Sequence, residues 1–112
     1  MANAKSNGER YKYAKIDTAP AAAGYWCDSV SMSKVNAKSL FISVWGGGSA
    51  TVTIQFKTAD PVNGAWTDYS TDETIEDGSR FILEDWAAGV KWRVGVKSGG
   101  YSSGTVWVGI DW

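Results

Sequence analysis

The chain has 112 residues, of which 44% are hydrophobic, and it contains 7 Trp, 5 Tyr and 3 Phe. This length and composition suit one domain with a single packed core, and they exclude a chain that is disordered throughout. Histidine is absent, which excludes Ser/His/Asp and Cys/His catalytic arrangements and His-ligated metal sites, and 12 acidic residues nearly balance 11 basic ones.

The chain starts with small, polar residues, and we interpret residues 1–9 as a flexible arm that precedes a single domain over residues 10–112. The arm lacks the apolar run of a signal peptide, and no stretch approaches the roughly 18 apolar residues of a membrane span. The single cysteine, Cys27, cannot form an intramolecular disulfide, which is usual for a protein made in reducing cytoplasm. We therefore expect a cytoplasmic origin and no membrane partner.

Strands with period-two alternation are expected in the first half of the domain. Weaker candidates at residues 10–16 and 25–35 flank a loop at residues 18–24, which lacks periodicity and bulky side chains. Residues 38–45 place apolar side chains at alternate positions, and residues 50–58 do the same after a glycine-rich turn, so we interpret them as an antiparallel pair. Their expected inward-facing side chains are Leu40, Ile42, Val44, Val52, Ile54 and Phe56.

The second half repeats this pattern. Residues 80–86 form a weaker candidate strand, and residues 91–97 and 104–112 alternate cleanly around the glycine-rich segment SGGYSSG, which predicts a hairpin with a long loop. No window has the apolar spacing of a helix. The sequence thus predicts an all-β fold, an antiparallel β-sandwich or jelly roll of about eight short strands, with a small closed barrel as the alternative.

Aromatic side chains are the most informative residues. We expect Trp26, Trp92 and Trp112 in the core, because each can shield a large area between two sheets. Phe41, Trp45 and Trp107 instead share their strand faces with small or polar residues, which predicts an outward-facing group that either contacts a partner or is covered by the arm or a loop. A last group falls near strand ends or in loops, where rings can stack on sugars or anchor a protein partner: Trp66, Trp86 and Tyr101.

The charged residues do not indicate a catalytic or metal site. The acidic run at residues 72–77 lacks the spacing of a calcium-binding loop, and a chain of this size offers little material for a cleft between two catalytic carboxylates. The acidic balance also argues against nucleic-acid binding. We therefore predict a protein that is not an enzyme and that uses no cofactor or metal.

Two segments, ATVTIQFKTADPVNGAWTDYST and GVKWRVGVKSGGYSSGTVWVGIDW, together resemble the small β-sandwich domains of tailed-phage structural proteins, over about residues 38–112. In its size and polar arm the whole chain is similar to the capsid decoration proteins, also called staple or cement proteins, of epsilon-fifteen-like short-tailed phages. The resemblance implies a jelly roll on the outer capsid surface of the virion, made in the host cytoplasm, that bridges neighbouring major capsid proteins.

The function predicted from the sequence is accordingly a virion structural protein that clamps the major capsid protein and forms a dimer or another small homo-oligomer. Its candidate contact residues are Lys5, Arg10, Phe41, Trp45 and Trp107. One alternative is a carbohydrate-binding module, with a surface glycan as partner, in which Trp66, Trp86, Tyr101 and Trp107 stack on sugar rings. The other alternative is an accessory domain of a tail or fibre.

Overall fold

The computed structural model describes residues 10–32, 34, 35, 37–58, 64–72, 79–84 and 89–112. Within these ranges the regular structure consists of β-strands, as the alternation predicts. The strands are β1 (Tyr11–Ile16), β2 (Tyr25–Trp26), β3 (Ser39–Trp45), β4 (Ser49–Ala50), β5 (Val52–Lys57), β6 (Thr67–Asp72), β7 (Ser79–Glu84), β8 (Lys91–Val96), β9 (Tyr101–Ser103) and β10 (Val106–Asp111).

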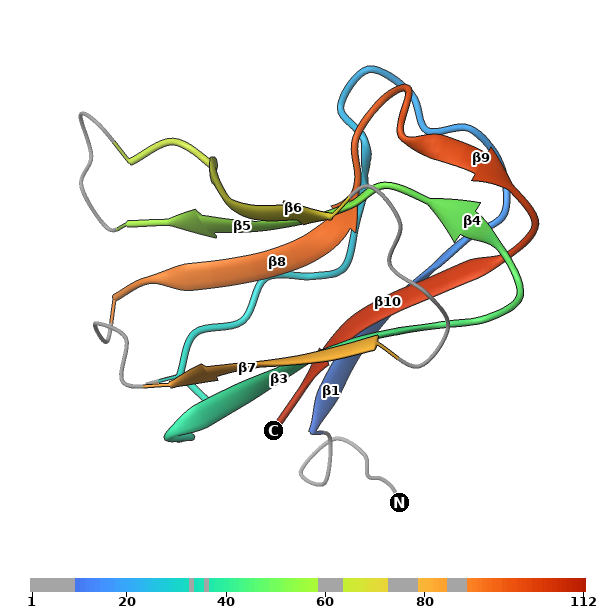
Figure 1. The fold of residues 1–112 in the computed structure, drawn as a ribbon. Coiled ribbons are helices and arrows are strands. Elements are labelled where there is room, and N and C mark those ends of the chain that lie inside the picture. Colours follow the sequence, from blue (N-terminus) through green and yellow to red (C-terminus); the bar gives the residue numbers. More distant parts are fainter. Residues whose placement is uncertain (1–9, 33, 36, 59–63, 73–78, 85–88) are drawn as a thin grey trace.

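Two four-stranded antiparallel sheets form the layers of a sandwich (Figure 1). Sheet A has the order β1-β10-β3-β7, sheet B has the order β2-β8-β5-β6, and β4 and β9 form a short ribbon at one end. Among the eight strands of the two sheets, each successive strand changes sheet except at the step from β5 to β6, which gives the winding of a jelly roll. The predicted fold class is confirmed, and the open strand order favours the sandwich over the barrel.

Both hairpins predicted from the sequence are wrong. Strands β3 and β5 lie in opposite sheets, and so do β8 and β10, although each pair follows directly along the chain apart from the short strands β4 and β9. Alternation shows which face of a strand is buried but not which strand lies beside it. The glycine-rich segments carry the chain from one layer to the other, and Gly46 and Gly104 adopt positive φ angles of 112° and 73° there.

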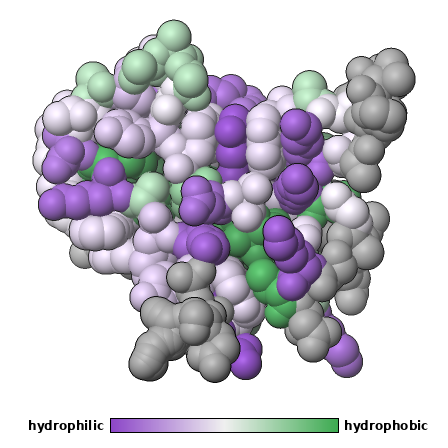
Figure 2. Space-filling model, turned by 180° about the vertical axis from the view of Figure 1, so that it is seen from behind, coloured by the Kyte–Doolittle hydropathy of each residue, from purple (hydrophilic) through white to green (hydrophobic). Residues whose placement is uncertain are grey.

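The core between the sheets contains the alternating aliphatic side chains. Leu40, Ile42 and Val44 of β3 face Val52 and Ile54 of β5 across this core, and all are at most 2% exposed. Trp92 is fully buried, as predicted, and its ring lies 5.6 Å from that of Phe56, which is half-buried rather than fully inward-facing. Seen from behind, the surface is mostly hydrophilic or neutral, and strongly hydrophobic areas are small (Figure 2).

Two tryptophans predicted to lie in the core do not lie in it. Trp26 is half-buried on the outer face of sheet B, because its partner Gly95 has no side chain and leaves room for the indole to lie against the strand. Trp112 packs only partly against the core and borders a cavity of about 410 Å³ together with Lys12, Lys34 and Val35.

The sequence analysis did not predict strand β6. Its sequence is TDYSTD, which lacks alternating apolar residues.

Candidate binding surfaces

An aromatic strip lies on the outer face of sheet A and consists of Tyr11, Tyr13, Trp45 and Trp107. The rings of Tyr11 and Tyr13 stack with centroids 4.6 Å apart, and Tyr13 meets Trp45 edge-on at 4.8 Å. Trp45 and Trp107 are direct cross-strand partners, and their rings are nearly parallel, with an interplanar angle of 7° and centroids 5.9 Å apart. Contacts between neighbouring rings therefore connect strands β1, β3 and β10 into one surface.

Gly109 makes the contact between Tyr13 and Trp45 feasible. It sits opposite Tyr13 on the central strand β10, and a Cβ atom at this position would overlap the tyrosine ring. Because the position is glycine, the Tyr13 ring can lie across β10 and reach β3. The strip is accessible, since Tyr11 and Tyr13 are 48% and 42% exposed.

The same face continues toward β7. Asp111 is the partner of both Tyr11 and Phe41, and Phe41 is in turn the partner of Ile82, which is 55% exposed. At the other end of the strip, the Lys15 ammonium lies 5.9 Å from the centre of the Trp107 ring. Sheet A thus presents a group of aromatic side chains, which are enriched in protein contact surfaces.

A second feature, which we call the arginine clamp, lies on the outer face of sheet B. The guanidinium carbon of Arg93 is 4.2 Å from the ring centre of Trp26 and 4.1 Å from that of Trp66. Arg93 points outward because it alternates with the buried residues Trp92 and Val94 of β8. The Trp26 indole N–H donates to the carbonyl of Ala23 at 2.8 Å, which fixes the plane of the ring.

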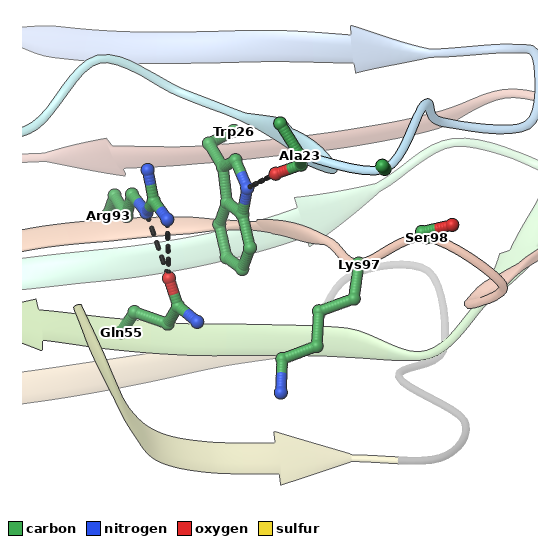
Figure 3. Close-up of a pocket in the computed structure, with 7 residues that line it drawn as sticks. Ala23, Trp26, Gln55, Arg93, Lys97 and Ser98 are labelled. Atoms are coloured by element: carbon green, nitrogen blue, oxygen red, sulfur yellow. Dashed lines mark hydrogen bonds between the residues drawn. The ribbon is translucent and has the colours of Figure 1, made fainter.

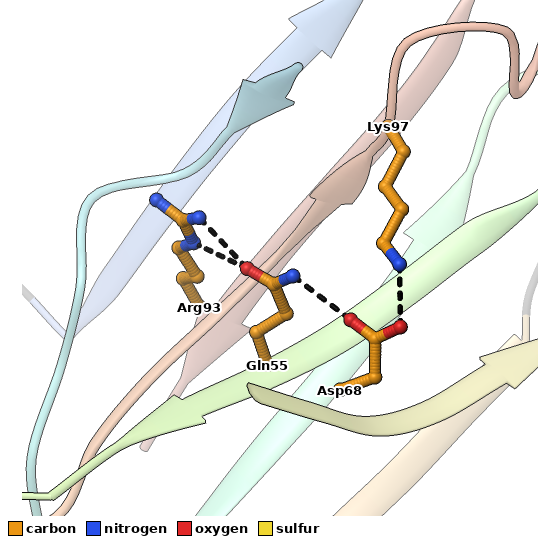
Figure 4. Close-up of polar contacts among 4 residues, drawn as sticks. All are labelled: Gln55, Asp68, Arg93 and Lys97. Atoms are coloured by element: carbon orange, nitrogen blue, oxygen red, sulfur yellow. Dashed lines mark hydrogen bonds and ion pairs between the residues drawn. The ribbon is translucent and has the colours of Figure 1, made fainter. Parts of the chain in front are cut away.

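A chain of polar contacts runs from the arginine clamp across the sheet (Figure 4). Arg93 donates from Nε and Nη2 to Oε1 of Gln55, at 2.9 and 2.7 Å, and Gln55 Nε2 donates to Oδ1 of Asp68 at 2.9 Å. The Lys97 ammonium pairs with Oδ2 of the same carboxylate. Hydrogen bonds from Lys97 and then Gln55 hold the pKa of Asp68 below its ordinary value, and burial lowers the pKa of Arg93.

A cavity of about 340 Å³ adjoins this chain (Figure 3). Its lining residues come from the loop before β2, from β5, and from β8 and the turn after it: Ala22, Ala23, Trp26, Gln55, Arg93, Lys97 and Ser98. In the close-up, Arg93 and Lys97 lie on opposite sides of the Trp26 ring. The cavity therefore combines an indole, an amide and two cationic side chains, which are groups that bind polar ligands.

The residues predicted from the sequence divide between the two faces. Phe41, Trp45 and Trp107 share the outer face of sheet A and are each half-buried, whereas Trp66 belongs to the arginine clamp on the opposite sheet. The hydroxyl of Tyr101 donates to the carbonyl of Gly104 at 2.7 Å and so supports a turn. Trp66, Tyr101 and Trp107 do not form a common site, and their predicted roles in binding remain predictions.

The remaining predicted contact and binding residues are Lys5, Arg10 and Trp86. Arg10 is exposed, and its carbonyl accepts the backbone N–H of Trp112 at 3.0 Å. Lys5 and Trp86 lie outside the described residues, as does most of the acidic run at residues 72–77.

Among the described residues, no three His, Cys, Asp or Glu side chains lie close enough together to hold a metal ion. No helix in this part of the chain is long and apolar enough to cross a membrane.

The sequence reasoning missed several members of both surfaces. Tyr11 and Tyr13 were not among the candidate contact residues, although their alternation with Lys12 and Ala14 places them on one face of the candidate strand at residues 10–16. Arg93 and Gln55 have the same outward parity on two strands, and the residue pairing that brings them together depends on the sheet order. Gln55 is only 7% exposed although it lies on the outer face of sheet B, and Arg93 donates two hydrogen bonds to it.

Cys27 is buried between the layers. Its thiol accepts the backbone N–H of Val94 at 3.5 Å, and burial raises its pKa to about 11. The thiol is therefore protonated at neutral pH and is a poor nucleophile.

The comparisons with known proteins establish similarity in fold. No family model matches the chain, and no curated protein matches it. The crystal structure of PirA superposes with a TM-score of 0.56 at 18% identity and covers 97% of this chain and 98% of its own. Lower scores are found for the SPBc2 prophage-derived protein YomS, at 0.47 and 15% identity over 90% and 93% of the two chains, and for a CBM4 structure, at 0.44 and 15% identity over 88% and 66%.

Proposed function

We propose that the protein is a virion structural protein that decorates the outer surface of a phage capsid and clamps neighbouring major capsid proteins. The observation that carries the proposal is the aromatic strip, in which each ring contacts the next on one accessible face, in the order Tyr11, Tyr13, Trp45 and Trp107. Soluble domains seldom keep such a group in water, and contiguous exposed aromatic residues are typical of surfaces that bind a partner. The sequence resemblance over about residues 38–112 supplies the kind of partner.

The strip is suited to binding because its rings are already fixed. They project from strands of one antiparallel sheet and contact one another, so little side-chain freedom remains to be lost on association. Tyrosine and tryptophan also provide a large contact area together with a polar group at the ring edge. A rigid sandwich with such a face can bridge two capsid subunits, and many copies on one shell add avidity.

Sedimentation with empty shells of an epsilon-fifteen-like phage that lack their decoration protein tests the proposal. The full-length protein should pellet with the shells, and Trp45→Ser should weaken binding by roughly thirtyfold or more, because truncation of a central aromatic contact costs about 2 kcal/mol or more. A protein that stays entirely in the supernatant would refute the proposal.

Two exposed tyrosines provide a matched pair of variants. Tyr13 in β1 and Tyr25 in β2 are 42% and 45% exposed and lie in opposite sheets. Tyr13→Ser should weaken shell binding and Tyr25→Ser should leave it unchanged. Equal effects would show that the shell is not bound through sheet A.

Two other occupants of the strip are separate outcomes of the same preparation. A second copy of the chain on the strip would give a dimer in light scattering that Trp45→Ser converts to a monomer, without any requirement for shells. Binding to tails or fibres and not to shells would support the accessory-domain alternative and contradict capsid decoration.

A further inference from the structure

The cavity beside the arginine clamp lies on sheet B, on the opposite side of the sandwich from the aromatic strip, and the proposed capsid contact does not use it. Its volume of about 340 Å³ falls at the lower end of the range of about 300–1,000 Å³ that is usual for small-ligand sites. Such a volume suits one or two rings of a small polar ligand. The proposed capsid contact therefore does not account for this cavity.

The lining groups are held in place before any ligand arrives. The Trp26 indole is fixed on one side by its hydrogen bond to Ala23 and is flanked by the Arg93 guanidinium. Gln55 is 7% exposed and makes hydrogen bonds through both its oxygen and its nitrogen, so its amide cannot rotate freely. A ligand would meet a flat apolar ring beside polar groups of fixed orientation, which is the combination that recognises a sugar ring and its hydroxyl groups.

The charge of the lining indicates which sugars fit. The charged residues that line the cavity are Arg93 and Lys97, and both are cationic. The carboxylate partner of Lys97 is Asp68, and both side chains of this ion pair are exposed, at 48% and 43%. Exposed ion pairs of this kind contribute little stability, so Lys97 can exchange Asp68 for the carboxylate of a ligand at small cost.

We propose that this cavity binds a carboxylate-bearing saccharide, with Trp26 contacting the sugar ring, Lys97 pairing with the carboxylate, and Gln55 and Ser98 binding hydroxyl groups. A nucleotide is a less suitable ligand, because the net charge of the chain is −1 and Lys97 already pairs with the Asp68 carboxylate, which disfavours a group with several negative charges. The site is independent of the proposed capsid contact, so the two can fail separately.

NMR titration of the ¹⁵N-labelled full-length protein tests the proposal, since the indole N–H signals of Trp26, Trp45 and Trp107 report on the two faces separately. Trigalacturonate and sialyllactose supply two kinds of acidic sugar, and galactotriose and lactose are their uncharged counterparts. At least one acidic sugar should shift the Trp26 signal in a saturable way, leave Trp45 and Trp107 unchanged, and bind at least tenfold more tightly than its counterpart. No saturable shift, or equal affinity for the uncharged sugar, would overturn the proposal.

Two lysine variants separate a specific contact from a general effect of charge. Lys97→Gln changes an exposed residue in the lining, and Lys91→Gln makes the same change at an exposed position of β8 outside it. The first should reduce affinity by about 10- to 100-fold, as loss of a charged hydrogen bond does, and the second should have no effect. Equal losses in both variants, or tighter binding of adenosine monophosphate than of either acidic sugar, would overturn the proposal. Shell sedimentation should be unchanged in Lys97→Gln.

Discussion

Replacement of Arg93 by methionine should lower the free energy of unfolding by about 2–3 kcal/mol, although Arg93 is only half-buried and forms no ion pair with the described residues. The effect is expected because Arg93 holds together three segments that are distant in sequence. It contacts Trp26 of β2, Trp66 ahead of β6 and Gln55 of β5.

The magnitude follows from these contacts. Loss of the two N–H donors of Arg93 leaves the side-chain oxygen of the buried Gln55 without these hydrogen bonds, and an unsatisfied buried acceptor costs about 1–3 kcal/mol. The two ring contacts contribute about 0.5–1 kcal/mol each at a partly exposed site. Methionine recovers part of the loss, because it still packs against both rings. It also removes the cost of burying the positive charge of Arg93, a cost that is evident in the lowered pKa of this residue.

Urea unfolding followed by tryptophan fluorescence measures the effect, and a double-mutant cycle with Gln55→Met isolates the Arg93–Gln55 contact. The double variant should be more stable than the sum of the two single changes predicts, by about 1 kcal/mol or more. Arg93→Lys should fall between the wild type and Arg93→Met, because lysine keeps the charge but not the paired N–H donors. Additive effects within about 0.3 kcal/mol would refute the view that the clamp and the polar chain act as one unit.

Three further predictions concern single sites. Cys27 should not react with a thiol reagent at pH 8 in the folded protein, and its contribution to stability should be lost as the pH rises toward 11, because the unfolded thiol ionises first; fast labelling at pH 8 would contradict its burial. Gly109→Ala should displace the Tyr13 ring and cost about 1–2 kcal/mol in urea unfolding, and an unchanged stability and Tyr13 environment by NMR would contradict the geometry. The pKa of Asp68 is depressed, so the wild type should be more stable than Asp68→Asn at neutral pH, and this difference should shrink as the pH falls through the pKa of Asp68 in the folded protein. Lys97→Gln should raise the pKa of Asp68 in a carboxyl NMR titration. An unchanged pKa would show that the ion pair between Lys97 and Asp68 does not form in solution.

The fold class could be predicted from the sequence because burial on one face of a strand leaves a direct pattern. The alternation of Leu40, Ile42 and Val44 matches their burial, and the same is true of Val106, Val108 and Ile110. Strand pairing could not be predicted, because a glycine-rich segment can either turn a chain back on itself or carry it to the other sheet. Strand β6 was missed because its side chains are polar, and its position comes from pairing with β5.

The candidate sites depended on this missing information. The outward parity of Trp45 and Trp107 was visible in the sequence, but their contact requires β3 and β10 to be neighbours in sheet A. Trp26 could not be placed because its strand has only 2 residues, too few to show alternation, and its position depends on a glycine on a strand far away in sequence. Sequence reasoning thus found residues that face outward, whereas only the sheet order showed which of them meet.

A reconstruction of the decorated capsid would test the central claim most directly, namely that the aromatic strip of sheet A is the surface that grips the shell. The account predicts that Tyr11, Tyr13, Trp45 and Trp107 are covered by a capsid subunit or a neighbouring copy, with the cavity beside Trp26 open to solvent on the opposite sheet. A particle in which sheet A faces the solvent and another face of the protein touches the shell would contradict it.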